Sequence, residues 1–231
     1  MLCGVEGFGV LRSVPTADGK YRIMNREIAF YSNPFSGQYV DVWKNPLTGE
    51  DCEVQPIHNH YVAAELSPVM KMDFEGTMRE FPFTPPWTVL GADVFQVFEV
   101  HTAYPSPMKV AQWPRESSGD VIRISEIFQR TARLAEIEDE SRTSAHYTGT
   151  WTRVGPWLPW MLMGQAEGHI LYRTFMKKLY SVDELPAQLR DATAKRYPEF
   201  FEAPALSDWG KPNDSSWGTY MKECRPRPPR A

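Results

Sequence analysis

Turn signals recur at short, regular intervals through the first sixty residues, and this spacing limits the folds that the chain can adopt. Clusters of Gly, Pro, Asn, Asp and Ser occur at residues 16–19, 32–37 and 45–49, with short runs of apolar and polar residues between them. Such spacing is typical of antiparallel strands in a sandwich or barrel. We therefore expect an antiparallel meander of four strands, over residues 5–14, 21–31, 39–44 and 52–57.

The middle of the chain has a less regular stretch, followed by a run of predicted strands. Residues 61–86 show a loose pattern with several prolines, so we expect a loop that crosses the surface there. Residues 93–104 alternate as a strand does. Residues 122–137 fit either a helix or a strand, and we favour a strand because it can pair with residues 145–154 across a polar turn.

The C-terminal part combines a last strand with a helix. Residues 169–179 are predicted as a strand, and Ser-Val-Asp-Glu then forms a capping box that opens a helix over residues 182–197. We predict one mainly β domain over residues 1–205, an antiparallel barrel or strongly curved sheet with C-terminal helices packed outside. An α+β arrangement is the alternative. Residues 206–231 are predicted to be an extended or disordered tail.

Charge and cysteine content exclude several classes of function. The net charge is only −4, and charges of both signs are spread along the chain, so we expect no nucleic-acid partner. There is no apolar run of about 18 residues, and we expect no membrane partner. Three scattered cysteines, without a visible signal peptide, argue against a disulfide framework and favour a reducing, cytoplasmic location.

Residues 151–165, WTRVGPWLPWMLMGQ, concentrate aromatic side chains where a strand has to end. Pro156 and Pro159 cannot donate ladder hydrogen bonds, so the segment is expected to fold over one end of the sheet. It forms either a hydrophobic plug or the wall of a site for a flat ligand. We predict that three tryptophans serve as core and wall at once: Trp151, Trp157 and Trp160.

Pairs of ionisable residues supply the predicted chemistry. Glu99 and His101 share one strand face about 6–7 Å apart, as an acid–base pair would, or else they form a structural or surface pair. His146 and His169 flank the tryptophan-rich segment, and each is either structural or part of the site. We predict the catalytic residues to be His101, Glu99, His169 and Tyr147.

Arg153 shares its predicted strand face with Tyr147 and Trp151. Burying an unpaired guanidinium costs several kcal/mol, so Arg153 needs an acidic partner, Glu126 or Glu136, or a wet cavity. In a cavity it would hold an anionic group, with Tyr147 as a proton donor. The predicted substrate-binding residues are Arg153, Trp151, Trp157, Trp160 and His146.

A metal site is the second alternative. His58 and His60 would lie on one strand face, and a third ligand could come from Glu99, His101, His146 or His169. The chain has neither an HExxH motif nor paired cysteines, so we predict no metal and no other cofactor. Dinucleotide-binding, Walker and GxSxG motifs are also absent from the sequence.

Several long segments resemble a known protein family. These are GVEGFGVLRSVP, REIAFY, NPLTGE, WPRESSG, SEIF and WTRVGPWLPWMLMGQAEGHILY. Together they resemble the bacterial and fungal proteins grouped as domain of unknown function family 1838, over about residues 4–204. The resemblance implies a further N-terminal segment in most members. It also implies Asn-Asp-Pro after the fourth strand, where this chain has HNHYV instead.

These observations favour an enzyme that acts on an apolar, aromatic small molecule. The expected reaction is cofactor-independent acid–base chemistry, as in a lyase, decarboxylase, isomerase or cyclase. A non-catalytic protein that binds such a ligand is the first alternative, and a His-ligated metal enzyme is the second. The expected partners are the small molecule and, as one option, a second copy of the chain.

Overall fold

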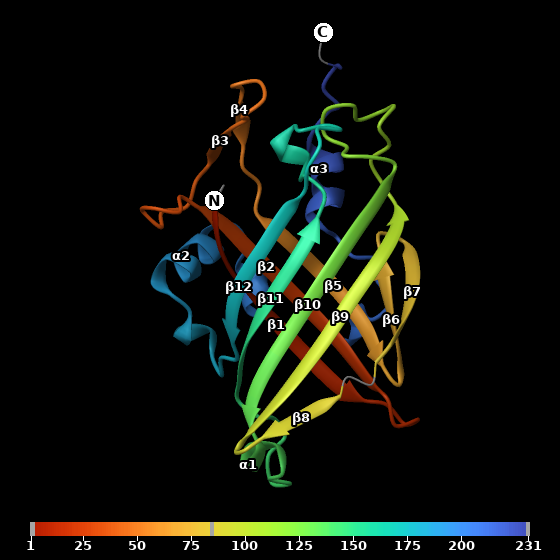
Figure 1. Cartoon of the computed structure of the whole chain (residues 1–231), viewed down its shortest axis with the longest axis vertical. Helices are drawn as coiled ribbons and strands as arrows, with labels where there is room; N and C mark the ends of the chain where they lie inside the picture. The colour runs from red at the N-terminus through yellow and green to blue at the C-terminus, as the bar shows by residue number, and fades with distance from the viewer. Residues whose placement is uncertain (1–2, 84–85, 230–231) are drawn as a thin grey trace.

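Two five-stranded antiparallel sheets face each other in the computed structural model, which describes residues 3–83 and 86–229 (Figure 1). The N-terminal sheet has the order β1 (Gly4–Pro15), β2 (Tyr21–Ser32), β5 (Ile57–Leu66), β6 (Val69–Phe74) and β7 (Thr77–Pro82). The C-terminal sheet has the order β12 (Ile170–Lys177), β11 (Tyr147–Gly155), β10 (Val121–Arg133), β9 (Asp93–Pro105) and β8 (Trp87–Leu90). The two sheets cross at a large angle in Figure 1.

The mainly β prediction is confirmed, but the described residues do not form a closed barrel. The edge strands β1 and β12 do not pair with each other. Pro82 ends β7 and Pro86 precedes β8, and proline cannot donate a ladder hydrogen bond. The chain therefore passes from one sheet to the other here instead of extending a single continuous sheet. The result is two facing sheets that are not hydrogen-bonded to each other along their edge strands.

The loop predicted over residues 61–86 is wrong. This stretch contains the end of β5, all of β6 and β7 and the approach to β8, while residues 84 and 85 lie outside the described part. The alternation of MKMDF buries Met70 and leaves Lys71 exposed, as in a strand with one covered face. Glu75 and Gly76 both have positive φ, which permits the tight turn between β6 and β7.

The meander prediction holds for the first two strands only. β1 and β2 pair along their whole length, but the next strand beside β2 is β5. The third and fourth predicted strands contain a small separate hairpin, β3 (Val42–Lys44) and β4 (Asp51–Glu53). The buried Asn45 amide accepts from two backbone N–H groups of the connecting turn and donates to the Met161 carbonyl at 2.8 Å, which ties this hairpin to the tryptophan-rich segment.

The strand prediction for residues 122–137 is confirmed over most of that range. β10 pairs with β11 from Ser125–Val154 to Ala132–Tyr147, and with β9 on its other side. The last residues instead form a short helix, α1 (Leu134–Ile137).

Helical segments cover the outer face of the N-terminal sheet, as predicted. They are η2 (Val182–Glu184), which begins with the predicted capping box, α2 (Ala187–Arg196) and η3 (Pro198–Phe201). Ile28 and Phe30 of β2 pack against Leu185, Leu189 and Phe200 of this layer. No helix in the described part of the chain is long and apolar enough to cross a bilayer.

The prediction of an extended or disordered tail over residues 206–231 is wrong for most of that range, of which residues 230 and 231 are not described. It contains η4 (Leu206–Asp208) and α3 (Ser216–Glu223), whose Tyr220 is buried. The segment before α3 lies along β5, where the His58 N–H donates to Ser216 Oγ and the His60 N–H to the Asp214 carbonyl. β6 pairs only with the far end of β5, so these N–H groups need another partner.

Candidate functional site

A row of aromatic rings lines the inner face of the C-terminal sheet. Trp151 of β11, Phe128 of β10 and Phe98 of β9 are direct neighbours in register. Their ring centroids are 6.4 Å apart for Trp151 and Phe128, and 5.9 Å apart for Phe128 and Phe98. Tyr172 of β12 stacks on Trp151 at 5.6 Å. These stacked rings form an apolar row on the side of the sheet that faces the other sheet.

The opposite wall is built from small residues. Tyr31 reaches across to Tyr172, so alternation along β2 turns Ala29 toward the C-terminal sheet, and the paired Gly7 of β1 lies beside it. Gly7 and Gly9 are exposed although they are on this inner face, so solvent enters along β1. A Cβ on Gly7 would lie 2.3 Å from the Ile28 carbonyl oxygen, which leaves room for glycine alone. Small residues of the N-terminal sheet thus lie opposite the large rings of the C-terminal sheet.

One guanidinium and two carboxyl groups lie between the sheets. Arg153 of β11 and Glu126 of β10 are neighbours in register, with Nε and Oε1 3.2 Å apart. Glu27 of β2 comes from the opposite sheet, close enough that the charges of both residues act on it. The side chains of Arg153 and Glu126 keep 24% and 19% of their surface exposed, so water reaches this pair between the sheets.

Glu27 is held by amide groups in an unfavourable environment for its charge. Its Oε1 accepts from Asn59 Nδ2 at 2.7 Å and its Oε2 from Asn25 Nδ2 at 3.0 Å. Burial raises the pKa of Glu27, and the charge of Glu126 raises it further. The two amide hydrogen bonds and the charge of Arg153 oppose this rise but do not cancel it. Glu27 therefore holds its proton to higher pH than an ordinary glutamate.

Three tyrosines surround the charged groups. The Tyr31 and Tyr172 hydroxyls are 3.1 Å apart and join the two sheets. Burial raises the pKa of Tyr104 to about 12 and raises the pKa of Tyr31 and Tyr172 as well. All three phenols are therefore neutral near pH 7 and are suited to hydrogen bonding, not to acting as bases.

Two buried hydrogen-bond donors on the inner face of β11 lack an acceptor among the described residues. They are Trp151 Nε1 and Arg153 Nε. Arg153 Nε is close enough to Glu126 for an ion pair but is not aligned for a hydrogen bond. Burying an unsatisfied donor costs about 1–3 kcal/mol, so such groups call for a water or ligand acceptor. The site can thus accept a ligand atom with a free lone pair.

Glu99 and His101 do not lie inside the domain as a catalytic pair would, and the alternative of a surface pair describes them. Both are on the outer face of β9, with side chains 56% and 53% exposed and Nε2 and Oε2 3.5 Å apart. The inner face of β9 carries Phe98, Val100 and Tyr104 instead. The alternation was identified correctly, but its polar half faces solvent. The structure therefore does not bring Glu99 and His101 to Arg153.

The other predicted polar residues are dispersed. His169 is exposed just before β12. His146 stacks on Tyr180 at 5.9 Å, and its backbone N–H donates to Glu136. Tyr147 shares the inner face of β11 with Arg153 but lies six residues away, about 20 Å along the strand. Of the predicted site residues, the structure brings together Arg153 and Trp151.

Trp157 and Trp160 belong to a plug at one end of the sheets. Trp160 lies in η1 (Pro159–Met161), is 5% exposed, and packs against Tyr31 at 5.3 Å and Trp43 at 5.8 Å. Trp157 Nε1 donates to the Ala166 carbonyl at 3.1 Å. A hollow of about 10 Å³ borders Trp160, room for roughly one water. The plug interpretation therefore describes these two residues, and the wall interpretation describes Trp151.

The histidines of the metal alternative lie on the outer side of the N-terminal sheet, packed against Phe200. His58 Nε2 is 3.0 Å from Thr219 Oγ1, and His60 Nε2 is 3.7 Å from Glu199. Burial lowers the pKa of both histidines. Within the described ranges, no three His, Cys, Asp or Glu side chains are grouped so that they could hold a metal ion. The predicted ligand set does not assemble.

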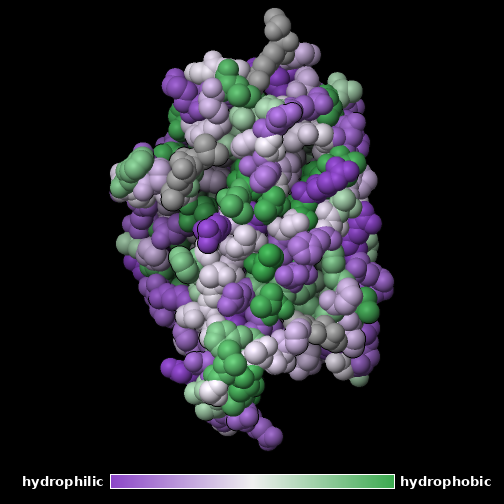
Figure 2. All heavy atoms as spheres, in the orientation of Figure 1, coloured by the Kyte–Doolittle hydropathy of each residue, from purple (hydrophilic) through white to green (hydrophobic). Residues whose placement is uncertain are grey.

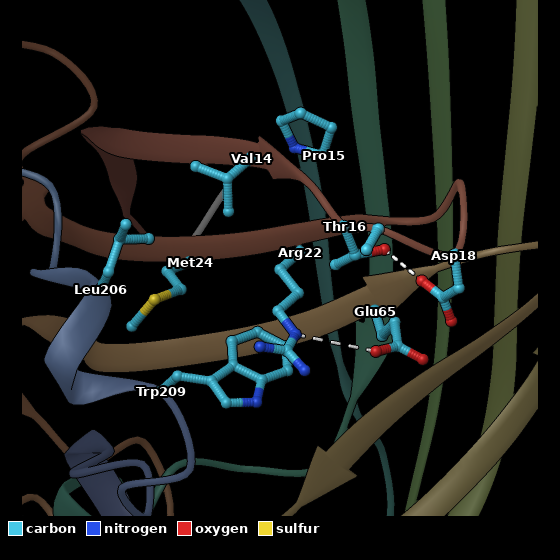
Figure 3. A pocket seen from close by; sticks show the side chains of 10 residues that line it. Val14, Pro15, Thr16, Asp18, Arg22, Met24, Glu65, Leu206 and Trp209 are labelled. Atoms are coloured by element: carbon cyan, nitrogen blue, oxygen red, sulfur yellow. Dashed lines mark hydrogen bonds and ion pairs between the residues drawn. The ribbon is translucent and has the colours of Figure 1, made fainter.

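A cleft of about 480 Å³ lies elsewhere, between the β1–β2 turn and η4 (Figure 3). Its floor includes Met24 and Trp209, and the Arg22 guanidinium lies over the Trp209 ring at 4.7 Å. Arg22 is 44% exposed and faces Glu65, with 3.8 Å between Nε and Oε2. No predicted site residue lines this cleft. We place the candidate site between the sheets, because the buried charges and the donors without acceptors are there.

Comparison with protein families gives a match that spans nearly the whole chain. The family described as Protein of unknown function (DUF1838) matches residues 1–224. The chain belongs to this family. Comparisons with curated proteins and with solved structures found no match.

The residues that sequence reasoning missed in this DUF1838 protein come from β2 and β5. Glu27 lies in the motif REIAFY, where alternation with Ile28 and Phe30 places it on the face opposite the helices. A glutamate on the same face as Tyr31 was a usable signal. Asn59 could not be found in this way, because β5 was assigned in part to a loop.

Proposed function

We propose that this DUF1838 protein is an enzyme that binds a small, mainly aromatic molecule between its two sheets and transfers a proton on it. One observation carries the proposal: Glu27, with a raised pKa, lies between the sheets with Arg153 and Glu126, near a row of aromatic rings. A carboxyl whose pKa is moved toward neutrality can donate or accept a proton during turnover. Glu27 thus takes the acid–base role that the sequence suggested for Glu99 and His101.

The remaining groups bind and orient the ligand. The row formed by Trp151, Phe128 and Phe98 offers apolar aromatic surface against which an aromatic ring can pack. Arg153 Nε and Trp151 Nε1 are free to donate to an oxygen of the ligand, such as a carboxylate, phenolate or enolate. Glu126 holds the guanidinium in place. Proton transfer beside a stabilised oxyanion fits an isomerase, lyase, decarboxylase or cyclase.

A second candidate is a binding protein without catalysis. Both oxygens of Glu27 already accept hydrogen bonds, and Arg153 already has an ionic partner. Carboxyl and guanidinium groups that are paired in this way can hold a ligand without exchanging protons with it. Both candidates predict the same ligand. Only the enzyme predicts that a variant can lose turnover while it still binds this ligand.

A thermal-shift screen of aromatic acids and phenols identifies ligands, and NMR then follows their conversion. We expect Arg153→Met to lose binding, and Glu27→Gln to keep binding while turnover falls by about 10²–10⁴-fold. Glu140→Gln, an exposed carboxyl outside the site, is the control and should match the wild type. Undiminished turnover in Glu27→Gln would refute the catalytic role. Unchanged binding in a folded Arg153→Met would refute the site.

A further inference from the structure

The outer face of the C-terminal sheet has no helical layer over it among the described residues, unlike the outer face of the N-terminal sheet. Figure 2 shows this face, with apolar side chains scattered among polar ones. Phe175 is 93% exposed and Leu171 54%, both on β12, while Val97 of β9 is 43% exposed. Apolar side chains scattered singly are ordinary on a protein surface, so the arrangement of these residues, and not their number, carries the inference. The register defines how these side chains are arranged.

Residues on this face form rows that cross four strands from β9 to β12. One row is Glu99, Ile127, Thr152 and Arg173, and the next is Val97, Gln129, Thr150 and Phe175. In each row, the first and last residues are complementary to each other: an acid and a base in one row, two apolar side chains in the next. Arg173 forms no salt bridge within the described part of the chain, so its charge is uncompensated.

We propose that this face binds the same face of a second copy of the chain, about a two-fold axis that runs along the strands between β10 and β11. Such an axis places β9 of one copy over β12 of the other. Glu99 then faces the partner's Arg173, and Val97 faces the partner's Phe175. Because a two-fold interface repeats every contact, both pairs form twice. This self-complementarity of the rows favours a second copy over an unrelated partner.

The packing of twisted sheets is compatible with these pairs. In sheets that pack face to face, the strand directions of the two sheets differ by about 30°. The strands of each copy are then tilted by about 15° from the two-fold axis, and facing residues on the outer strands are shifted by roughly 3.5 Å relative to each other. An arginine side chain is long enough to span that shift. Neighbouring strands are about 4.8 Å apart, and residues on the same face of a strand are about 6.8 Å apart. Four rows across the four strands therefore cover an area of roughly 500 Å² per copy. Standard stable interfaces bury about 800 Å² per partner, so we expect a dimer that dissociates on dilution.

This inference does not depend on the proposed function. The dimer uses the outer face of the C-terminal sheet, while Arg153 and Trp151 lie on its inner face. The open side along β1 stays accessible when the outer faces meet. Failure of the dimer would leave the proposed function untouched, and failure of the proposed function would leave the dimer untouched.

Sedimentation velocity over a wide concentration range tests the proposal. The wild type should shift from monomer to dimer as concentration rises, and Phe175→Glu should stay monomeric. Phe35→Ser removes another exposed phenylalanine, 97% exposed in the turn after β2, and is the matched control that should still dimerise. Circular dichroism and melting temperature show that each variant is folded.

A charge exchange tests the geometry of the interface. Glu99→Arg and Arg173→Glu should each weaken dimerisation about tenfold or more, because each places like charges opposite each other. The double variant Glu99→Arg/Arg173→Glu should restore most of the wild-type affinity. A wild type that is monomeric at every concentration, or a Phe175→Glu variant that dimerises normally, would overturn the proposal. Failure of the double variant to recover would overturn the proposed two-fold arrangement.

Discussion

Replacing Arg153 by methionine should destabilise the domain more than replacing the whole ion pair. Methionine keeps much of the apolar stem of arginine but removes the guanidinium. Glu126 then lies between the sheets without its ionic partner, and Glu27 loses the favourable charge of Arg153. In the double variant Arg153→Met/Glu126→Leu the stranded carboxylate is gone, and the repulsion on Glu27 is gone with it.

The structure sets the size of this effect. Breaking a buried ion pair on one side costs about 3–5 kcal/mol, whereas replacing both partners by apolar residues is often neutral. Because 24% of Arg153 and 19% of Glu126 are exposed, water compensates part of the loss. We therefore expect about 3 kcal/mol for Arg153→Met and at most about 1 kcal/mol for the double variant.

Urea unfolding followed by tryptophan fluorescence measures both variants. The slopes of the transitions should agree, so that differences in midpoint report differences in stability. A double variant as unstable as Arg153→Met would show that packing of the arginine stem, not its charge, stabilises this site. A fully stable Arg153→Met would show that Glu126 is effectively in bulk water.

Three further predictions concern pH and packing. Because the pKa of Glu27 is raised in the folded state, the stability contributed by protonated Glu27 is complete below about pH 4.3 and is lost as pH rises through the folded-state pKa. The loss is at most about 1.4 kcal/mol per pH unit. Urea unfolding at several pH values should show the wild type losing stability relative to Glu27→Gln as pH rises, and parallel pH curves for the two proteins would contradict this. The lowered pKa of His58 acts in the opposite direction, so its contribution is complete above about pH 6.5 and is lost as pH falls, which the same titrations with His58→Gln should reveal as the loss of an acid-dependent slope. Gly7→Ala should cost about 1–3 kcal/mol in thermal or urea unfolding, because the new Cβ meets backbone, whereas Gly9→Ala meets the movable Asn25 side chain and should cost less; equal costs would refute the steric argument.

Strong local patterns made much of the fold predictable. The alternation and turns of β1, β2, β9, β10 and β11 define those strands without tertiary information. The hairpin between β10 and β11 followed because one candidate partner strand lay across a polar turn. β6 and β7 were missed because they are short, and the prolines that follow them gave a stronger loop signal than the alternation of MKMDF.

The site was harder to predict, because a strand has two faces and the sequence does not say which one is inside. The inward position of Arg153 was predicted correctly through its aromatic neighbours. The same reasoning placed His101 inside, although Val100 and Tyr104 on the opposite face of its strand are the buried residues. The strand face that carries Val100 and Tyr104 is buried, and this leaves His101 on the exposed face. Alternation indicated which face of β2 carries Glu27, but its position beside Arg153 required knowledge that β2 lies opposite β11, a contact between distant parts of the chain.

The segment that completes β5 also sets an order for folding. The His58 N–H can form its hydrogen bond only when Ser216, which lies 158 residues later in the chain, has reached β5. A large loop must therefore close before this strand edge is covered. Until then the edge offers unpaired backbone groups to any other strand, including one from a neighbouring molecule. Amide protons of β5 near His58 should therefore gain protection late in refolding. Refolding at high protein concentration should therefore increase aggregation at this step, before those amide protons are protected.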